Sequence, residues 1–485
     1  MTRDHLEFLS WLAGARLLRL GALAAIVFAG AALALISTPA QAVPSFARQT
    51  GLACEACHTI PPELTPFGRR FRLNAYTLTT RPPLVSDIDD HKRNTVFLTD
   101  LPGISILLQT TYDHWNRALP DSAVAGAKSQ SDTFQFPQQF SIAYAGAVSD
   151  HIGAWLQYTY LQNAGNIGID NNEVRYSDHT DNNDWVWGVT LNNNPSFQDV
   201  WNTGSAYGIP YFPTQSLYNA VPALGPLGGT GPRTPIFTTF AGNAAGLGAY
   251  VWYKDSIYLE LSEYHSAKSG SSIAEEDSSN LHLGGGTIDA FAPYWRAVYE
   301  RDWGYNSASI GTSGMYVKFV PYEPALAGQT LSPGNQNRYL DLSVDWQYQY
   351  NGQHNIFTFL GHYTHENQEN DPGLVPTYFS NSTDHLNQLQ MTGEYYYNRH
   401  YGGLISFVRT TGTTDVPFNG GTGSPANQYE VFELDYLPWF NTKFLVQYDV
   451  YNVVNNNQNP FFLAGSTNPK ASDNNTWVVG LWMDF

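Results

Sequence analysis

The amino-acid sequence predicts an all-β protein, an antiparallel barrel of about sixteen strands in an outer membrane, with a small N-terminal segment that plugs it. The first observation is composition: 31 Tyr, 26 Phe, 13 Trp and 42 Gly with only 14% charged residues, which is typical of a large β structure with aromatic girdles. The second is a period-two alternation of apolar and polar residues. The third is that no stretch after residue 42 approaches the roughly 18 consecutive apolar residues of a spanning helix.

The alternation is clearest in two segments. In the last segment the residues on one face of the predicted strand are Trp477, Val479, Leu481, Met483 and Phe485. The same period extends over residues 340–350, where apolar residues alternate with Asp, Ser and Gln. In a membrane barrel the apolar face meets lipid and the polar face lines the lumen. A soluble sandwich also alternates, but aromatic residues near strand ends, the terminal Phe485 and connections of very unequal length favour the barrel.

The strand number follows from length. Residues 96–485 number 390, and about 24 residues for a strand with its connection predict roughly sixteen strands. Residues 202–247, rich in Gly, Pro, Asn and Thr, are expected to form one long external loop. The Asn-rich stretches 170–194 and 452–475 are expected to form others.

The first 42 residues predict a secretory signal. Arg16 and Arg19 precede an apolar run from Leu20 to Ile36, and a small-residue cleavage site, Ala40-Gln41-Ala42, follows it. A transmembrane anchor is the alternative, but the cleavage site favours a mature chain that starts at Val43.

The pentapeptide Cys54-Glu55-Ala56-Cys57-His58 contains both cysteines of the chain. Its spacing is that of a covalently attached c-type haem, in which the two thiols bond the haem vinyl groups and His58 is the proximal iron ligand. A disulfide, a redox dithiol and a zinc half-site are alternatives, and a zinc site would lack further cysteine ligands. We therefore expect one covalent haem c and, beyond the haem, no separate catalytic residue.

Charge divides the mature chain into two parts. Residues 43–95 hold seven Lys or Arg against five Asp or Glu, whereas residues 96–485 hold 14 against 35. A sixteen-strand barrel has an open lumen, so we expect the basic haem segment, residues 43–95, to act as its plug. Predicted lumen carboxylates could hold the plug, attract cations or only keep the lumen hydrated; they are Glu260, Asp341, Asp345, Glu394, Glu433, Asp435 and Asp449.

Three arginines follow the haem motif. Arg69, Arg70 and Arg72 are candidates for contacts with the haem propionates, because guanidinium groups match carboxylates. A solvated basic face is the alternative.

The sixth iron ligand is left open. Met315, Met391 and Met483 fall on predicted lipid faces, which disfavours His/Met ligation. His91 is therefore the candidate distal ligand, with an open sixth position as the alternative. His362 and His365 are three residues apart on a predicted strand, so their side chains point to opposite faces and do not form a metal pair.

The segment from Val43 to Gly51, the Cys-x-x-Cys-His motif and the stretch Pro62-Glu-Leu-Thr-Pro-Phe-Gly-Arg69 resemble the start of the fused monohaem cytochrome-porins of iron-oxidising bacteria, nearest to the acidophile version. The resemblance extends over the mature chain and includes Gly188-Val-Thr-Leu-Asn-Asn-Asn-Pro195. It implies an outer-membrane ferrous-iron oxidoreductase that takes electrons from ferrous iron at a haem accessible toward the cell surface. It also implies that the electrons pass to a periplasmic cytochrome or copper protein.

Two other functions remain open on the sequence. The chain could be a diffusion porin whose haem segment is a structural or sensor plug, or a conduit for a different external donor or acceptor. Outer-membrane lipid is an expected partner in each case, and nucleic acid is not.

Overall fold

The computed structural model describes residues 45–78, 103–120, 129–161, 166–204, 206, 208, 211–212, 244–266, 286–321, 336–373, 375, 379–419, 423–454, 456 and 470–485. The signal at residues 1–42 and the candidate ligand His91 lie outside these ranges. No helix in the described part of the chain is long and apolar enough to cross a membrane.

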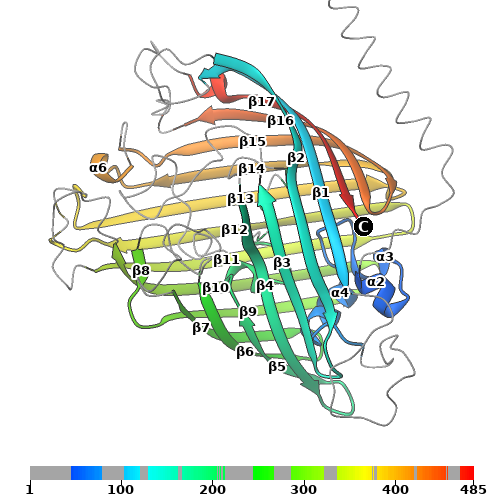
Figure 1. Cartoon of the computed structure of the whole chain (residues 1–485). Helices are drawn as coiled ribbons and strands as arrows, with labels where there is room; N and C mark the ends of the chain where they lie inside the picture. The colour runs from blue at the N-terminus through cyan, green and yellow to red at the C-terminus, as the bar shows by residue number, and fades with distance from the viewer. Residues whose placement is uncertain are drawn as a thin grey trace, which may run out of the picture. The chain divides into compact units, whose positions relative to one another are not determined.

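One antiparallel sheet closes on itself to form a barrel (Figure 1). Its strands are β1 (Ile104–Pro120), β2 (Ser129–Ala147), β3 (Ile152–Leu161), β4 (Asn166–His179), β5 (Trp185–Asn192), β6 (Ala245–Tyr253), β7 (Ile257–His265), β8 (Gly286–Ile288), β9 (Ala292–Trp303), β10 (Asn306–Pro321), β11 (Asn337–Asn351), β12 (Asn355–Glu369), β13 (Thr383–Tyr397), β14 (Tyr401–Gly412), β15 (Asn427–Trp439), β16 (Thr442–Val453) and β17 (Thr476–Asp484).

Closure is made by the first and last strands, because β1 pairs with β17 from Leu107 opposite Asp484 to Trp115 opposite Thr476. Strands β8 and β9 pair with successive parts of the same edge of β10. They therefore occupy one position, and the wall formed by the described residues has sixteen antiparallel positions. This confirms the predicted antiparallel barrel and the predicted strand number.

The two faces of the wall differ in polarity, as the alternation predicts. In β17 the side chains of Trp477 and Val479 are exposed on the outside, whereas the alternating residues Val478 and Gly480 are buried. Leu434 on β15 is 73% exposed and Glu433 beside it is 2% exposed. An apolar exterior with a polar interior is the pattern of a barrel that meets lipid.

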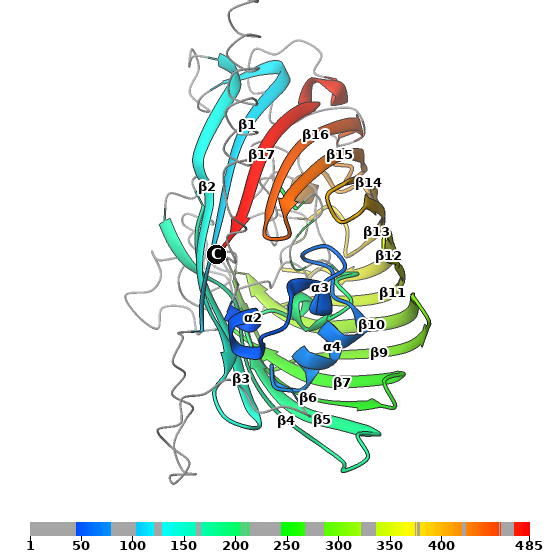
Figure 2. The ribbon, with the colours of Figure 1, turned by 90° about the vertical axis from the view of Figure 1, so that its right-hand side faces the viewer.

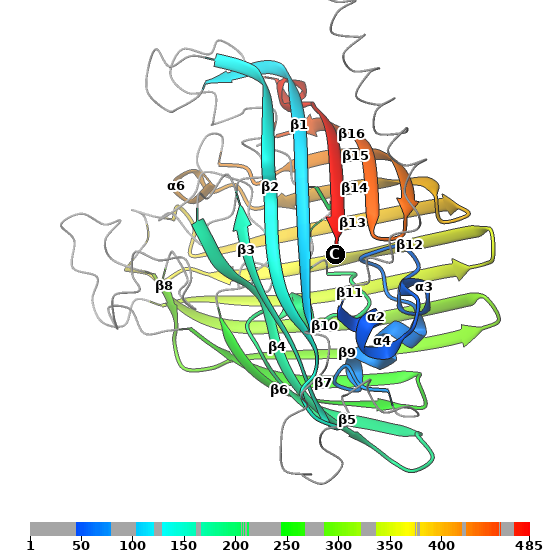
Figure 3. The ribbon, with the colours of Figure 1, turned by 45° about the vertical axis from the view of Figure 1, so that its right-hand side comes forward.

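The two ends of the barrel also differ. At one end the connections are short, for example residues 254–256 between β6 and β7 and residues 440–441 between β15 and β16. Aromatic side chains gather beside these turns, including the stacked pair Tyr401 and Tyr436, whose ring centroids are 5.2 Å apart. At the other end the connections are long, up to the 52 residues between β5 and β6. The C-terminus and the N-terminal helices lie at the short-turn end (Figures 1 and 3).

Two loop predictions are wrong. Most of residues 170–194 forms β4 and β5 with a short turn between them, because Val174 and Tyr176 alternate with polar residues in a strand pattern. The first part of the predicted external loop at residues 202–247 is also misplaced, because Asn202, Thr203 and Phe212 are buried inside the barrel. Asn and Gly residues predict where a strand ends. They do not determine whether the connection that follows turns away from the barrel or into its interior.

A charged side chain at Leu434 should destabilise the barrel, because this position faces lipid near the middle of β15. We expect Leu434→Lys to lower the free energy of unfolding by about 2–4 kcal/mol. The measurement is a urea titration of the protein folded into lipid vesicles. The control is Gln353→Lys in the exposed turn between β11 and β12; equal losses in the two variants would contradict a lipid-facing Leu434.

Candidate functional site

The N-terminal segment folds into three short helices, α2 (Ser45–Thr50), α3 (Cys54–Cys57) and α4 (Pro66–Leu73). Thr65 caps α4 by accepting a hydrogen bond from the Gly68 amide at 3.1 Å, and Pro66 at the first helical position suits this start. The Thr65 amide also donates to the Cys57 carbonyl. A Cβ atom at Gly68 would lie 2.1 Å from that carbonyl oxygen, so glycine is required for α4 to approach the Cys-x-x-Cys helix.

The helices lie inside the ring of strands at its short-turn end (Figure 2). The Ser45 amide donates to Ser105 Oγ on β1 at 2.8 Å. Ala75 packs against β3 so closely that a Cβ atom at Gly153 would lie 2.0 Å from the Ala75 carbonyl oxygen. We call residues 45–78, the described part of the segment that the sequence predicts to be a plug, the plug from here on.

The haem motif lies on the inner part of the plug. Cys54 and Cys57 are free thiols, and burial raises the pKa of Cys57 to about 11 and also raises that of Cys54. Burial lowers the pKa of His58 to about 4, which keeps the imidazole neutral, the form that binds iron. Its Nδ1 atom is enclosed and has no hydrogen-bond partner of normal geometry. Both thiols and the neutral imidazole are therefore available for a cofactor.

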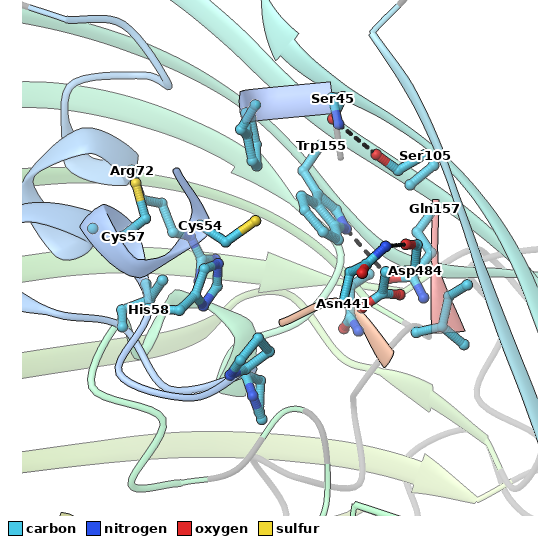
Figure 4. Close-up of a pocket in the computed structure, with 18 of the residues that line it drawn as sticks. Ser45, Cys54, Cys57, His58, Arg72, Ser105, Trp155, Gln157, Asn441 and Asp484 are labelled. Carbon is cyan, nitrogen blue, oxygen red and sulfur yellow. Dashed lines mark hydrogen bonds between the residues drawn. The ribbon is translucent and has the colours of Figure 1, made fainter. Parts of the chain in front are cut away.

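A cavity of about 400 Å³ separates this motif from the barrel wall, within the size range typical of ligand and cofactor sites. Cys54, Cys57 and His58 line one side of it, while Trp155 and Gln157 from β3 line another. Figure 4 shows the Cys54 sulfur directed toward Trp155 across the cavity. Adjacent thiols, a neutral histidine and a largely apolar cavity fit a covalently held haem, and nothing in the donor set conflicts with one.

The three arginines separate in space. Arg69 is fully buried and forms an ion pair with Glu300 at 2.7 Å, and Arg70 pairs with Asp255 in a short turn. Arg72 lines the cavity, although its guanidinium also pairs with Glu173. A role beside the propionates stays a prediction for Arg72, whereas Arg69 and Arg70 join the plug to the barrel.

The other histidines and methionines do not complete the site. Among the described residues, no histidine besides His58 and no methionine lines the cavity. Met315 is 0% exposed and packs inside the barrel, so its predicted lipid-facing position is wrong. His362 is buried and His365 is half-buried on the other face of β12, as predicted.

The acids that pair with the plug arginines were not predicted from the sequence. The predicted lumen carboxylates are buried inside the barrel, as expected, but the plug arginines pair with Glu300 on β9 and Glu173 on β4. A surplus of acids in a chain does not identify which one meets a given arginine. Glu63 of the plug was also missed, and the only signal for it was its place between the haem motif and α4.

Glu63 is the most connected acid of the plug. Its carboxylate accepts hydrogen bonds from Asn202 Nδ2 at 2.8 Å and from the Tyr211 hydroxyl at 2.7 Å. The same hydroxyl lies 3.0 Å from Glu394 Oε1 on β13. A hydroxyl has one proton to donate, so a proton on one of the two carboxyl groups would supply the second hydrogen bond. The junction of plug and wall thus favours a protonated carboxyl group.

A closed antiparallel barrel with an apolar exterior and a polar interior defines an outer-membrane β-barrel of porin type. No protein-family model and no curated protein sequence matches the chain. Solved structures that are similar include the Salmonella typhi OmpF complex with daunomycin, with 12% identity, a TM-score of 0.45, and coverage of 79% of this chain and 97% of that chain. Two others are the outer membrane channel DcaP of Acinetobacter baumannii (10%, TM-score 0.43, coverage 79% and 96%) and an anion-selective porin from Comamonas acidovorans (12%, TM-score 0.42, coverage 79% and 98%).

The docking of the plug should depend on pH through Glu63. Burial raises the pKa of this carboxyl group to about 7 from 4.5, while the hydrogen bonds from Asn202 and Tyr211 oppose the shift. Between these values the docked plug holds a proton that a released plug would lose, so docking is strongest below pH 4.5 and weakens as the pH rises through about 7.

The measurement is the rate at which a protease cleaves the plug in detergent-solubilised protein between pH 4 and pH 8, with cleavage of a soluble peptide correcting for the protease's own pH dependence. Glu63→Gln should flatten the profile, because the amide resembles the protonated acid and does not titrate. Glu55→Gln, in the exposed part of the haem motif, is the matched control. A wild-type profile that rises toward acid would contradict the expected sign.

Proposed function

We propose that the chain is an outer-membrane cytochrome-porin that moves electrons from ferrous iron to a periplasmic carrier through one haem c held by Cys54, Cys57 and His58. The observation that carries the proposal is the cavity in front of this motif, lined by both free thiols and a neutral imidazole. The resemblance of residues 43–69 to fused monohaem cytochrome-porins supports the choice of ferrous iron as the donor.

Each residue of the site would have its own role in holding the haem. Cys54 and Cys57 would bond the haem and His58 would ligate its iron, while Arg72, Trp155 and Gln157 would surround it. When bound, the haem supplies one-electron chemistry. Each ferrous ion that is oxidised gives up one electron, which passes to the periplasmic acceptor, and the ferric ion stays outside the periplasm.

The position of the plug revises one expectation. The sequence predicts a haem accessible toward the cell surface, but the haem motif lies at the short-turn end of the barrel (Figure 2). In outer-membrane barrels the short turns face the periplasm and the longer loops face outward. We therefore propose that the electron leaves directly from the plug to a periplasmic cytochrome or copper protein. Ferrous iron would approach from the long-loop end, where the lumen carboxylate of Asp341, near the start of β11, would attract cations.

The second candidate is a diffusion porin in which the plug is a structural or sensor element. The porin-type barrel with its polar lumen favours it, and the barrel taken alone fits this function more directly than it fits electron transfer. The two candidates differ in what they require of the cysteines and of ferrous iron.

Covalent haem should depend on both thiols, because each forms one thioether bond. We expect Cys54→Ala to weaken, and the double variant with Cys57→Ala to abolish, haem staining of the chain in a denaturing gel. Glu55→Gln should stain like the wild type, since it lies between the cysteines without a role in attachment. Full staining of the double variant would refute covalent attachment at this motif.

Electron entry from iron is tested by stopped-flow absorbance. The oxidised, detergent-solubilised protein is mixed with ferrous iron at acid pH, and we expect the bands of reduced c-type haem to grow rapidly. Reduction by dithionite with none by iron would support the diffusion-porin or other-donor interpretation. His58→Gly should alter the haem spectrum and slow this reduction, because the proximal ligand is lost.

A further inference from the structure

The described residues 193–204, 206, 208 and 211–212, here called the inward segment, run through the interior of the barrel. Residues 192–203 are all buried, and Phe197, Trp201 and Phe212 are each no more than 1% exposed. We infer that the inward segment is a second closure, which crosses the lumen, locks the plug in place and prevents the barrel from conducting solutes.

The segment reaches from one wall of the barrel to the opposite wall. It leaves β5 after Asn192, and Asp199 pairs with Arg296 on β9 at 2.9 Å. Thr203 donates to Asp345 on β11 at 3.0 Å, and its carbonyl contacts His362 on β12 at 2.7 Å.

The far end of the segment reaches the closing strands. The Tyr211 hydroxyl contacts Glu394 on β13, and Phe212 packs with Leu445 on β16 and Val478 on β17. Its contacts thus extend from β5 around to β17, on the other side of the lumen. A chain that is held at both walls, with residues 192–203 all buried, cannot swing out as a surface loop does.

The inward segment also contacts the plug directly. Asn202 and Tyr211 both hydrogen-bond to Glu63, and Arg72 stacks on the Phe197 ring, with 4.0 Å between Cζ and the ring centroid. Trp201 Nε1 donates to Glu300, the acid that pairs with Arg69.

These contacts are costly to break one at a time. Arg69, Glu300 and Glu173 have fully buried side chains, and separating a buried ion pair leaves a charge without a partner in a medium of low dielectric constant. The plug and the inward segment are therefore expected to stay or to leave together. Phe197, Val200 and Asn202 also line the cavity of the haem motif, so the segment is its wall on the lumen side.

The experiment is single-channel recording of the full mature chain in a planar bilayer with concentrated KCl. We expect the wild type to conduct at least about tenfold less than an unplugged sixteen-strand porin recorded under the same conditions. Wild-type openings of porin size would overturn the inference. The conductance does not require ferrous iron or electron transfer, so it can fail while the proposed function stands, and the reverse also holds.

Two variants test the inward segment separately from the plug. Asp199→Asn removes the charge that meets Arg296, and Trp201→Ala removes the largest described side chain of the inward segment; both should produce open steps or frequent flickering. Arg338→Gln breaks an exposed ion pair with Glu369 on the barrel and should stay as silent as the wild type. Folding of every variant is checked by heat-modifiable mobility in gels, and folded, silent Asp199→Asn and Trp201→Ala proteins would overturn the role of the segment.

Discussion

The need to pair every backbone polar group in lipid is the constraint on which the rest of this structure depends. A sheet with free edges cannot be stable there, and the register of β1 against β17 removes both edges. Closure with sixteen positions then produces a lumen far wider than its own side chains can fill. The plug and the inward segment fill part of this lumen.

Filling a polar lumen with protein requires buried polar contacts. The plug meets the wall through Arg69 with Glu300 and Arg72 with Glu173, and the inward segment adds Asp199 with Arg296. Such pairs contribute little net stability compared with apolar packing, but each strongly disfavours any arrangement that leaves one member unpaired. They select one position for the plug, and this position brings the Cys-x-x-Cys-His motif to a cavity of defined shape.

The same arrangement links the proposed chemistry to the barrel. In the proposed function, the haem motif at the short-turn end would lie between a periplasmic electron acceptor and the inward segment. The inward segment then distinguishes the two candidate functions physically, because diffusion requires an open path through the lumen and electron transfer does not. Burial raises the pKa of Glu63 at the junction of plug and wall, so docking of the plug is expected to be tightest in acid.

The sequence by itself determined the features that depend on local pattern. Period-two alternation in β11 and β17 established the barrel, its two faces and the buried position of acids such as Asp345, and chain length set the strand number. The pentapeptide from Cys54 to His58 identified the candidate site, because its chemistry needs only neighbours in sequence. Only the tertiary structure decided which acid meets each arginine, the lumen-facing side of Met315 and the inward course of residues 193–212. The arginine pairs and the inward course depend on contacts between distant residues, such as Arg69 with Glu300, 231 positions apart, and no local pattern encodes which distant partner closes the space.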